Sequence, residues 1–383
     1  MTEWKEYKLK EIAQLEKDSW KVGDEKLPYI ALEHIVEGGL RLQGIGDSNT
    51  IASNKFRFNS DCFLFGKLRP YFRKLFRPNF EGICSTDIWV VKPRGENDKD
   101  FLFYFFANQD FVDFTYSGSS GTRMPRADWN FVSESKWNFP PLPEQKAIAS
   151  VLSSLDDKID LLHRQNKTLE AMAETLFRQW FVEEADEGWE EVPLGNSDLA
   201  KIIKSGINYF EGEKIYLATG DVNNTDIRGG TPITFNDKPS RANMEPVIYS
   251  VWFAKKGGVR KALMFDDYSY NLNNLILSTG FTGLKTTKLS HYYIWCYIMS
   301  TEFQEIKDSF VSGTVQPDIN NEGVNQIMIS KPDNETLLNF NKNVKELFFK
   351  ISFNQSQIRT LEKLRDTLLP KLMSGKVRVK MEE

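Results

Sequence analysis

The sequence predicts an α+β protein made of two similar halves, each a globular segment of mixed β-sheet and helices followed by one long helix. Three observations lead to this fold: a heptad pattern sustained for about four heptads, its return later in the chain, and short apolar runs bounded by Gly and Pro. We expect the two long helices to pair as an intramolecular antiparallel coiled coil, with the halves related by a pseudo-two-fold axis.

The first long helix is predicted over residues 143–183. Its apolar residues follow one another at alternating steps of three and four, which keeps one stripe of a helix against a partner helix. At about 1.5 Å per residue such a helix is roughly 60 Å long, too long for ordinary packing inside one compact domain. The stripe consists of Leu152, Leu155, Ile159, Leu162, Asn166, Leu169, Ala173, Leu176 and Trp180.

The second long helix, within residues 335–383, repeats the first when 192 is added to each residue number. The match extends upstream without a gap, so that Gly121 corresponds to Gly313. A period this long indicates a duplicated domain with its helix. The alternative is that each helix pairs with a helix of another chain. The second stripe consists of Val344, Leu347, Ile351, Asn354, Ile358, Leu361, Arg365, Leu368 and Leu372.

The globular segments are predicted at residues 1–142 and 184–334, and the last range, 335–383, also holds the C-terminal tail. An aromatic-rich core helix is expected in each segment, at 99–116 and at 291–310. Pro370 should kink or end the second long helix, and Gly375 is a stop signal. Strands are expected within 61–68, 83–93, 214–223, 246–265 and 272–280.

Composition excludes several classes of protein. No apolar run is long enough to span a bilayer, and the N-terminus lacks the apolar core of a signal peptide. Cys62, Cys84 and Cys296 are unclustered, which favours reduced thiols in a cytoplasmic protein and argues against a zinc site. The net charge of −4 means that any nucleic acid must be held by local patches.

Two basic patches occur at corresponding places in the halves. The first, within residues 65–80, has no acidic residue and is interleaved with aromatic ones, which suits phosphate contacts. The alternative is a strand edge protected by charge against aggregation. The candidate DNA-binding residues of the patches are Lys67, Arg69, Arg73, Lys74 and Arg77, then Lys255, Lys256, Arg260, Lys261, Lys285 and Lys288.

Two loops could reach base edges. Arg123 and Arg126 lie in a Gly/Ser/Pro-rich loop, and Gln316 lies in the corresponding loop of the second half. Arginine and glutamine make the bidentate pairings that discriminate guanine and adenine. The alternative is an ordinary surface loop.

Catalytic signatures are missing from the sequence. It contains neither a phosphate-binding G-x-x-x-x-G-K-[ST] loop nor G-x-G-x-x-G. Glu134 and Lys136 form an ExK triplet of the kind found in metal-dependent nucleases, but no paired carboxylate accompanies it. We therefore expect no catalytic residue, metal or cofactor in this chain.

Residues 141–181 resemble the central conserved region of the DNA-specificity subunit of Type I restriction–modification enzymes, and residues 361–379 resemble that family's distal conserved region. The resemblance implies two target-recognition domains, each reading one half of a bipartite double-stranded DNA target, with paired helices setting the spacer. It also implies two methyltransferase (modification) subunits as partners, to which restriction (motor) subunits are added. S-adenosylmethionine and ATP would be bound by those partners.

Two other function classes remain open at this stage: a stand-alone sequence-specific nuclease using Glu134 and Lys136, and a non-catalytic coiled-coil scaffold. Within the favoured class, the partner could be one fused restriction–methylation polypeptide. The stripes themselves predict a contact between Asn166 and Asn354, which antiparallel pairing would place opposite each other. The residues expected to pair the helices are Leu155, Ile159, Leu162, Asn166, Leu169, Leu347, Ile351, Asn354, Ile358 and Leu361.

Overall fold

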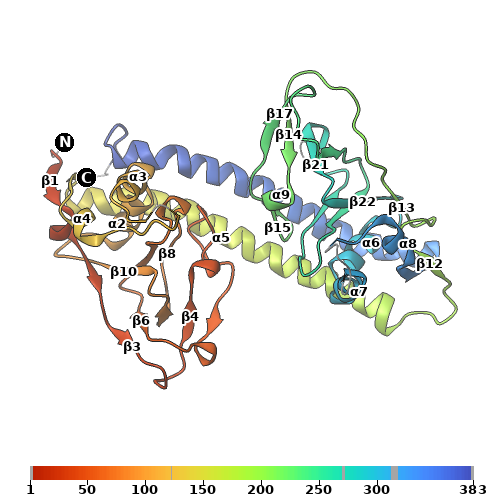
Figure 1. Ribbon diagram of the computed structural model, residues 1–383, viewed down its shortest axis with the longest axis horizontal. Helices are drawn as coiled ribbons and strands as arrows, with labels where there is room; N and C mark the ends of the chain where they lie inside the picture. The colour runs from red at the N-terminus through yellow and green to blue at the C-terminus, as the bar shows by residue number, and fades with distance from the viewer. Residues whose placement is uncertain (1–2, 122, 270–271, 312–317, 381–383) are drawn as a thin grey trace. The chain divides into compact units, whose positions relative to one another are not determined.

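The computed structural model describes residues 3–121, 123–269, 272–311 and 318–380. It has a mixed α+β fold with two long helices, α5 (Leu142–Arg178) and α9 (Asn334–Met373), as the heptad pattern predicts (Figure 1). The chain divides into two compact units, Met1–Leu161 with Ile358–Glu383, and Leu162–Gln357. Each unit therefore contains one globular segment and a part of each long helix. The domain limits given above remain a prediction.

The sheets of the first unit are formed largely by short strands. A two-stranded sheet pairs β1 (Lys5–Lys8) with β11 (Lys136–Phe139). A four-stranded sheet has the order β2 (Ala13–Glu16), β10 (Ile88–Pro93), β7 (Phe63–Gly66) and β8 (Leu75–Phe76). A five-stranded sheet has the order β3 (Ser19–Trp20), β6 (Lys55–Phe58), β9 (Gly82–Cys84), β4 (Pro28–Ile30) and β5 (Gly46–Asp47).

The described residues of the first unit form four shorter α-helices: α1 (Leu9–Ile12), α2 (Lys99–Ala107), α3 (Gln109–Ser117) and α4 (Trp129–Ser133). The single helix expected at 99–116 is wrong, because Asn108 has an extended backbone (ψ 137°) that ends α2 before α3 begins. Seven consecutive residues of α2, 101–107, are buried, so this helix lies inside the main core of the unit. Cys62 and Cys84 lie in a second core.

The second unit repeats this arrangement. Strands β12 (Glu191–Pro193) and β23 (Met328–Ser330) pair, and a four-stranded sheet follows the order β13 (Ala200–Ile202), β22 (Phe281–Thr286), β19 (Ser250–Ala254) and β20 (Ala262–Phe265). Another sheet has the order β17 (Thr231–Ile233), β14 (Lys214–Leu217), β21 (Leu275–Ser278) and β18 (Ala242–Met244). The strands β15 (Val222–Asn223) and β16 (Asp226–Ile227) form a separate hairpin. The parallel pair β14·β21 corresponds to the parallel pair β4·β9 of the first unit.

The shorter α-helices among the described residues of the second unit are α6 (His291–Met299), α7 (Thr301–Val311) and α8 (Asn321–Gln326). The expected single helix at 291–310 is again two, since Ser300 has an extended backbone (ψ 155°) between α6 and α7. Cys296 on α6 is buried in the unit's main core. None of the described helices has the length and apolar composition that crossing a membrane requires.

The long helices run antiparallel within each unit. In the first, Asp156 of α5 bonds to Arg365 of α9, and Glu144 bonds to Arg378, farther along the chain. In the second, the ring of Phe181, which follows α5, lies 4.9 Å from that of Phe340, near the start of α9. Pro370 does not end the second long helix, although ending it is one of the two outcomes expected of that proline. Helix α9 continues through Pro370 and ends at Met373.

Gly375 follows the end of α9 with a positive φ of 70°. A left-handed residue just past a helix end favours glycine, because other residues meet a steric penalty there. Its N–H donates to the carbonyl of Leu372 at 3.2 Å, which satisfies one of the carbonyls left open at the helix end. The predicted stop signal is confirmed.

Candidate nucleic-acid interface

Lys67 lies where an inner strand of the four-stranded sheet meets the Arg-containing loop. It directly follows β7, and its N–H donates to the carbonyl of Asp87 at 2.9 Å. Its own carbonyl accepts from the N–H of Ala127, also at 2.9 Å. These two backbone hydrogen bonds fix the backbone of Lys67, from which its half-buried side chain extends.

Lys255 occupies the same place in the second unit. It follows β19, its N–H donates to the carbonyl of Gly280 at 2.9 Å, and its carbonyl accepts from the N–H of Ile319 at 3.0 Å. Burial lowers the pKa of the Lys255 ammonium, opposed by the nearby charge of Asp318. The two lysines are therefore structurally equivalent, and we refer to their surroundings as the lysine–loop junctions.

Sequence comparison alone missed this equivalence because two different offsets apply. Downstream of the junction the halves align at 192, whereas Lys67 and Lys255 differ by 188, since 255 − 67 = 188. A short signal was present in both halves: Phe65-Gly66-Lys67 resembles Phe253-Ala254-Lys255. Only the pairing of the strands with the loop shows that the two triplets correspond.

The residue that follows the junction lysine, and the loop residue opposite it, differ in charge between the two units. The backbones of Leu68 and Arg126 form an isolated antiparallel β-bridge in the first unit. The backbones of Lys256 and Asp318 form the matching β-bridge in the second. The guanidinium of Arg126 is about half exposed and pairs with Asp87 at 3.1 Å. The loops therefore present an arginine in one unit and an aspartate in the other.

Other predicted DNA-binding residues of the first unit differ in their surroundings. Arg123 is exposed, and Arg69 lies over the Phe72 ring at 5.9 Å. Arg69 and Arg73 have positive φ values of 51° and 46°, uncommon for residues with a side chain, on either side of Pro70–Phe72.

Three basic side chains of the first patch, those of Arg73, Lys74 and Arg77, make hydrogen bonds within the protein. Arg73 donates to the carbonyl of Gly38 at 3.1 Å, and Lys74 donates to that of Leu32 at 2.8 Å. Burial lowers the pKa of Lys74. Arg77 bonds to side chains of α5 and α2, as described below. The patch is thus divided between residues at the junction and residues that also have internal partners.

In the second unit, most of the predicted cations likewise contact backbone or acidic groups. Arg260 donates to the carbonyl of Met299, Lys261 to that of Thr219 at 2.7 Å, and Lys285 to that of Ile248. Lys288 pairs with Asp267 at 3.5 Å, and the side chain of Lys256 is exposed. Gln316 lies outside the described residues. Whether these side chains contact DNA stays a prediction.

The residues expected to pair the long helices all lie on covered faces of their own units. Ile159, Leu162, Asn166, Ile351, Asn354 and Ile358 are buried, and Leu155, Leu169, Leu347 and Leu361 are half-buried. Within the second unit, the predicted contact is present: Asn354 Nδ2 donates to Asn166 Oδ1 at 2.8 Å. Asn354 Oδ1 is buried without a hydrogen-bond partner, so the pair leaves one acceptor unsatisfied.

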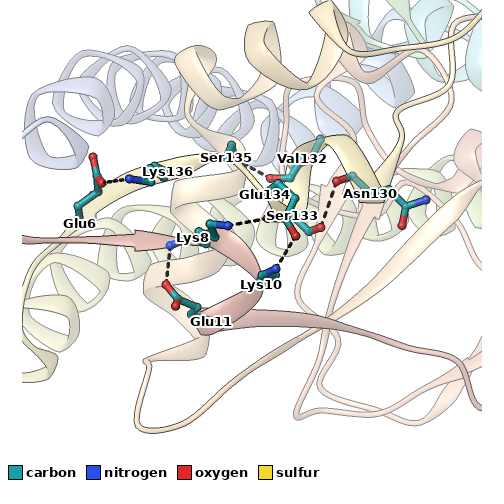
Figure 2. Close-up of polar contacts among 10 residues, drawn as sticks. All are labelled: Glu6, Lys8, Lys10, Glu11, Asn130, Val132, Ser133, Glu134, Ser135 and Lys136. Carbon is teal, nitrogen blue, oxygen red and sulfur yellow. Dashed lines mark hydrogen bonds and ion pairs between the residues drawn. The ribbon is translucent and has the colours of Figure 1, made fainter.

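The ExK triplet does not form a metal site. Figure 2 shows the Glu134 carboxylate held by Lys8 and Lys10, while Lys136 bonds instead to Glu6 at 2.8 Å. Hydrogen bonds from the two lysines lower the pKa of Glu134 to about 2. Among the residues that the structure describes, no group of three or more His, Cys, Asp or Glu side chains could hold a metal ion. This arrangement gives no support to the nuclease alternative.

The chain is similar to several known proteins that share one description. Residues 1–171 match the Type I restriction modification DNA specificity domain. The chain is 29% identical over 329 residues to the Type I restriction enzyme MjaIX specificity subunit of Methanocaldococcus jannaschii, with 76% of this chain and 71% of that one covered. It is 24% identical over 335 residues to the MjaVIII specificity subunit of the same organism, covering 78% and 75%.

The crystal structure of the Type-I restriction-modification system S subunit from M. genitalium has a similar fold. The match covers 99% of this chain and 97% of that one, with a TM-score of 0.57 and 15% sequence identity. Residues 1–171 therefore match the DNA specificity domain of Type I restriction–modification systems, and over about three quarters of its length the chain is similar to the specificity subunits of those systems.

Proposed function

We propose that the chain selects a bipartite double-stranded DNA target, with the globular segment of each unit reading one half of it. Its similarity to specificity subunits supports a role in selecting the target rather than in catalysis. The observation that carries the proposal is the repeated lysine–loop junction. Two segments of low sequence similarity keep a lysine at the same backbone position, beside a loop whose side chains differ.

The junctions suit the two tasks of sequence-specific binding. Phosphate contacts position a protein on DNA without reading sequence, and base contacts specify the sequence. Lys67 and Lys255 would provide the common phosphate contact. Arg126 and Asp318 would face different bases, because arginine pairs with guanine and a carboxylate accepts from cytosine.

The paired helices would set the distance between the half-sites. Half-sites on one face of duplex DNA lie about one helical turn, roughly 34 Å, apart. A helical spacer keeps its length, whereas a flexible linker has a broad distribution of end-to-end distances. Support for this role comes from the Asn166–Asn354 bond, which ties the helices in one register within the second unit.

Methylation and cleavage would be performed by partners: two methyltransferase subunits and, through them, restriction subunits. S-adenosylmethionine and ATP would bind to those partners, and this chain would bind no cofactor of its own. Since its ligand would be cellular DNA, we place its action in the cytoplasm.

The proposal is tested by methyl transfer from S-adenosylmethionine to a pool of duplex DNA. The purified chain alone should transfer no methyl groups, and the methyltransferase alone should transfer few. The reconstituted complex should methylate sites that share one two-part sequence. Methylation by the purified chain alone, or by the complex without any sequence preference, would contradict the proposal.

A further inference from the structure

Two arginines bracket β8, the edge strand of the four-stranded sheet in the first unit, and connect it to both long helices. Arg77 donates to Ser153 Oγ of α5 at 2.8 Å and pairs with Asp100 of α2 at 3.3 Å and Asp157 of α5 at 3.9 Å. Arg73, before the strand, lies 3.4 Å from Asp366 of α9. The side chains of both arginines are only 19% exposed, so little of their surface remains for another ligand.

The same network continues into the helix pair. The Arg77 guanidinium lies 5.3 Å from the centre of the Tyr104 ring, and the Tyr104 hydroxyl donates to Asp156 Oδ2 at 2.7 Å. Asp156 Oδ1 accepts from Arg365 at 2.8 Å, and the side chain of Arg365 is 2% exposed. Sheet edge, core helix α2 and both long helices are therefore joined by charged groups. We call this network the ionic joint.

The second unit has aromatic groups at the same helix positions. Phe348 stacks on Tyr292 of α6 with ring centres 4.9 Å apart and planes 11° apart. Phe349 lies 4.7 Å from the ring of Tyr268, which follows β20, and the Lys345 ammonium lies 5.8 Å from that ring. Adding 192 to 153, 156 and 157 gives 345, 348 and 349, so one set of positions contacts the globular segment in both units. We call the second arrangement the aromatic joint.

We propose that the ionic joint orients the first recognition segment on the long helices, and that Arg77 acts in it as a positioning residue. The inference rests on the proposed function. An arginine fork fixes direction through several bonds at once. Loss of Arg77 removes its bond to Ser153 and its pairs with Asp100 and Asp157, and it takes a positive charge away from the nearby Asp156, whose side chain is only 13% exposed. The aromatic joint orients the second segment through ring packing. Ionic contacts would therefore hold the segment that reads one half-site, and ring packing would hold the segment that reads the other.

The test uses the full chain in complex with its methyltransferase partner. Bound duplexes are selected from a random library and sequenced, which gives the preference at each base position. Arg77→Gln should reduce discrimination about tenfold, equivalent to about 1.4 kcal/mol, at the bases of one half-site and leave the other half unchanged. Tyr268→Leu, the matched change in the aromatic joint, should affect only the opposite half. Arg77→Lys should restore part of the loss, since it keeps the charge without the fork.

The outcomes separate this inference from others. A uniform loss of affinity for all sequences, with the salt dependence reduced by about one phosphate contact, would show that Arg77 touches DNA and overturn the inference. An equal loss at both half-sites would also overturn it. If Arg77→Gln does not fold, Ser153→Ala removes only one bond of the joint and should give a smaller loss at the same half-site. Lack of any two-part preference in the wild-type complex would instead refute the proposed function.

Discussion

Lys67 and Lys255 have the same charge at the same backbone position, and each is expected to contact one phosphate. Because every phosphate contact releases counterions, Lys67→Ala or Lys255→Ala should reduce the slope of log affinity against log salt by about 0.9. Affinity should fall by a similar factor for all sequences, since phosphates carry no base identity.

Binding of the reconstituted complex to DNA at several salt concentrations measures this slope. Lys136→Ala is the control: Lys136 is an exposed lysine on β11 of the first unit that pairs with Glu6. A slope that stays at the wild-type value in both junction variants would mean that the lysines only protect strand ends.

His291, at the start of α6, should make the second unit sensitive to acid. Burial, followed by the charge of Lys285, lowers the pKa of His291 to about 3, and its Nδ1 lies 2.8 Å from Thr286 Oγ1. The unfolded chain binds a proton below about pH 6.5 that the folded chain excludes. Stability is therefore complete above pH 6.5 and falls as the pH drops from 6.5 toward 3.

This histidine should contribute up to about 1.4 kcal/mol per pH unit to the fall in unfolding free energy. In His291→Gln the pH slope should be shallower by that amount, whatever the variant's stability at pH 7. The free energy of unfolding is measured by urea denaturation at several pH values from about 4 to about 7, a range that covers most of the interval between the two pKa values. Identical slopes in the two proteins would show that folding does not lower the pKa of His291.

At the scale of elements, the asparagine pair of the long helices gives opposite expectations for single and double variants. Asn166→Leu alone leaves the amide of Asn354 without its 2.8 Å partner and should destabilise the chain by about 1–3 kcal/mol. Changing both residues to leucine removes both polar groups and the unsatisfied Asn354 oxygen, so it should raise the melting temperature.

The double variant should also accept DNA sites whose spacer differs by one base pair, because a buried polar pair specifies register. Melting curves and methylation of sites with altered spacers measure the two effects. A double variant that melts lower than wild type, with unchanged spacer selection, would assign the pair no role in register.

The long helices and the asparagine contact could be predicted because heptad spacing alone determines which side chains share a stripe. The breaks at Asn108 and Ser300 could not, since neither residue is a strong helix breaker and tertiary packing decides the backbone there. The ionic joint was equally hidden: Arg77 and Ser153 are 76 residues apart, and a basic patch looks the same in sequence whether it faces DNA or acidic side chains.

At the scale of the molecule, two recognition segments on one chain should bind as a bivalent ligand. Once one half-site is bound, the second binds at a high effective concentration, so the intact target should bind about 10²–10⁴ times more tightly than either half alone. Competition between a full target, each half-site and a scrambled duplex measures the ratio. Equal affinity for the full target and one half-site would show that only one segment reads DNA.

The three cysteines give the molecule built-in reporters of local opening. Cys62 and Cys84 lie in one core of the first unit and Cys296 in the main core of the second, and burial raises the pKa of each thiol. A thiol reagent attacks the thiolate, so modification requires exposure of the core that holds the cysteine. The labelling rate at each cysteine therefore measures how often its own unit unfolds, without any added probe, and DNA that engages only one segment will slow the labelling of that segment alone.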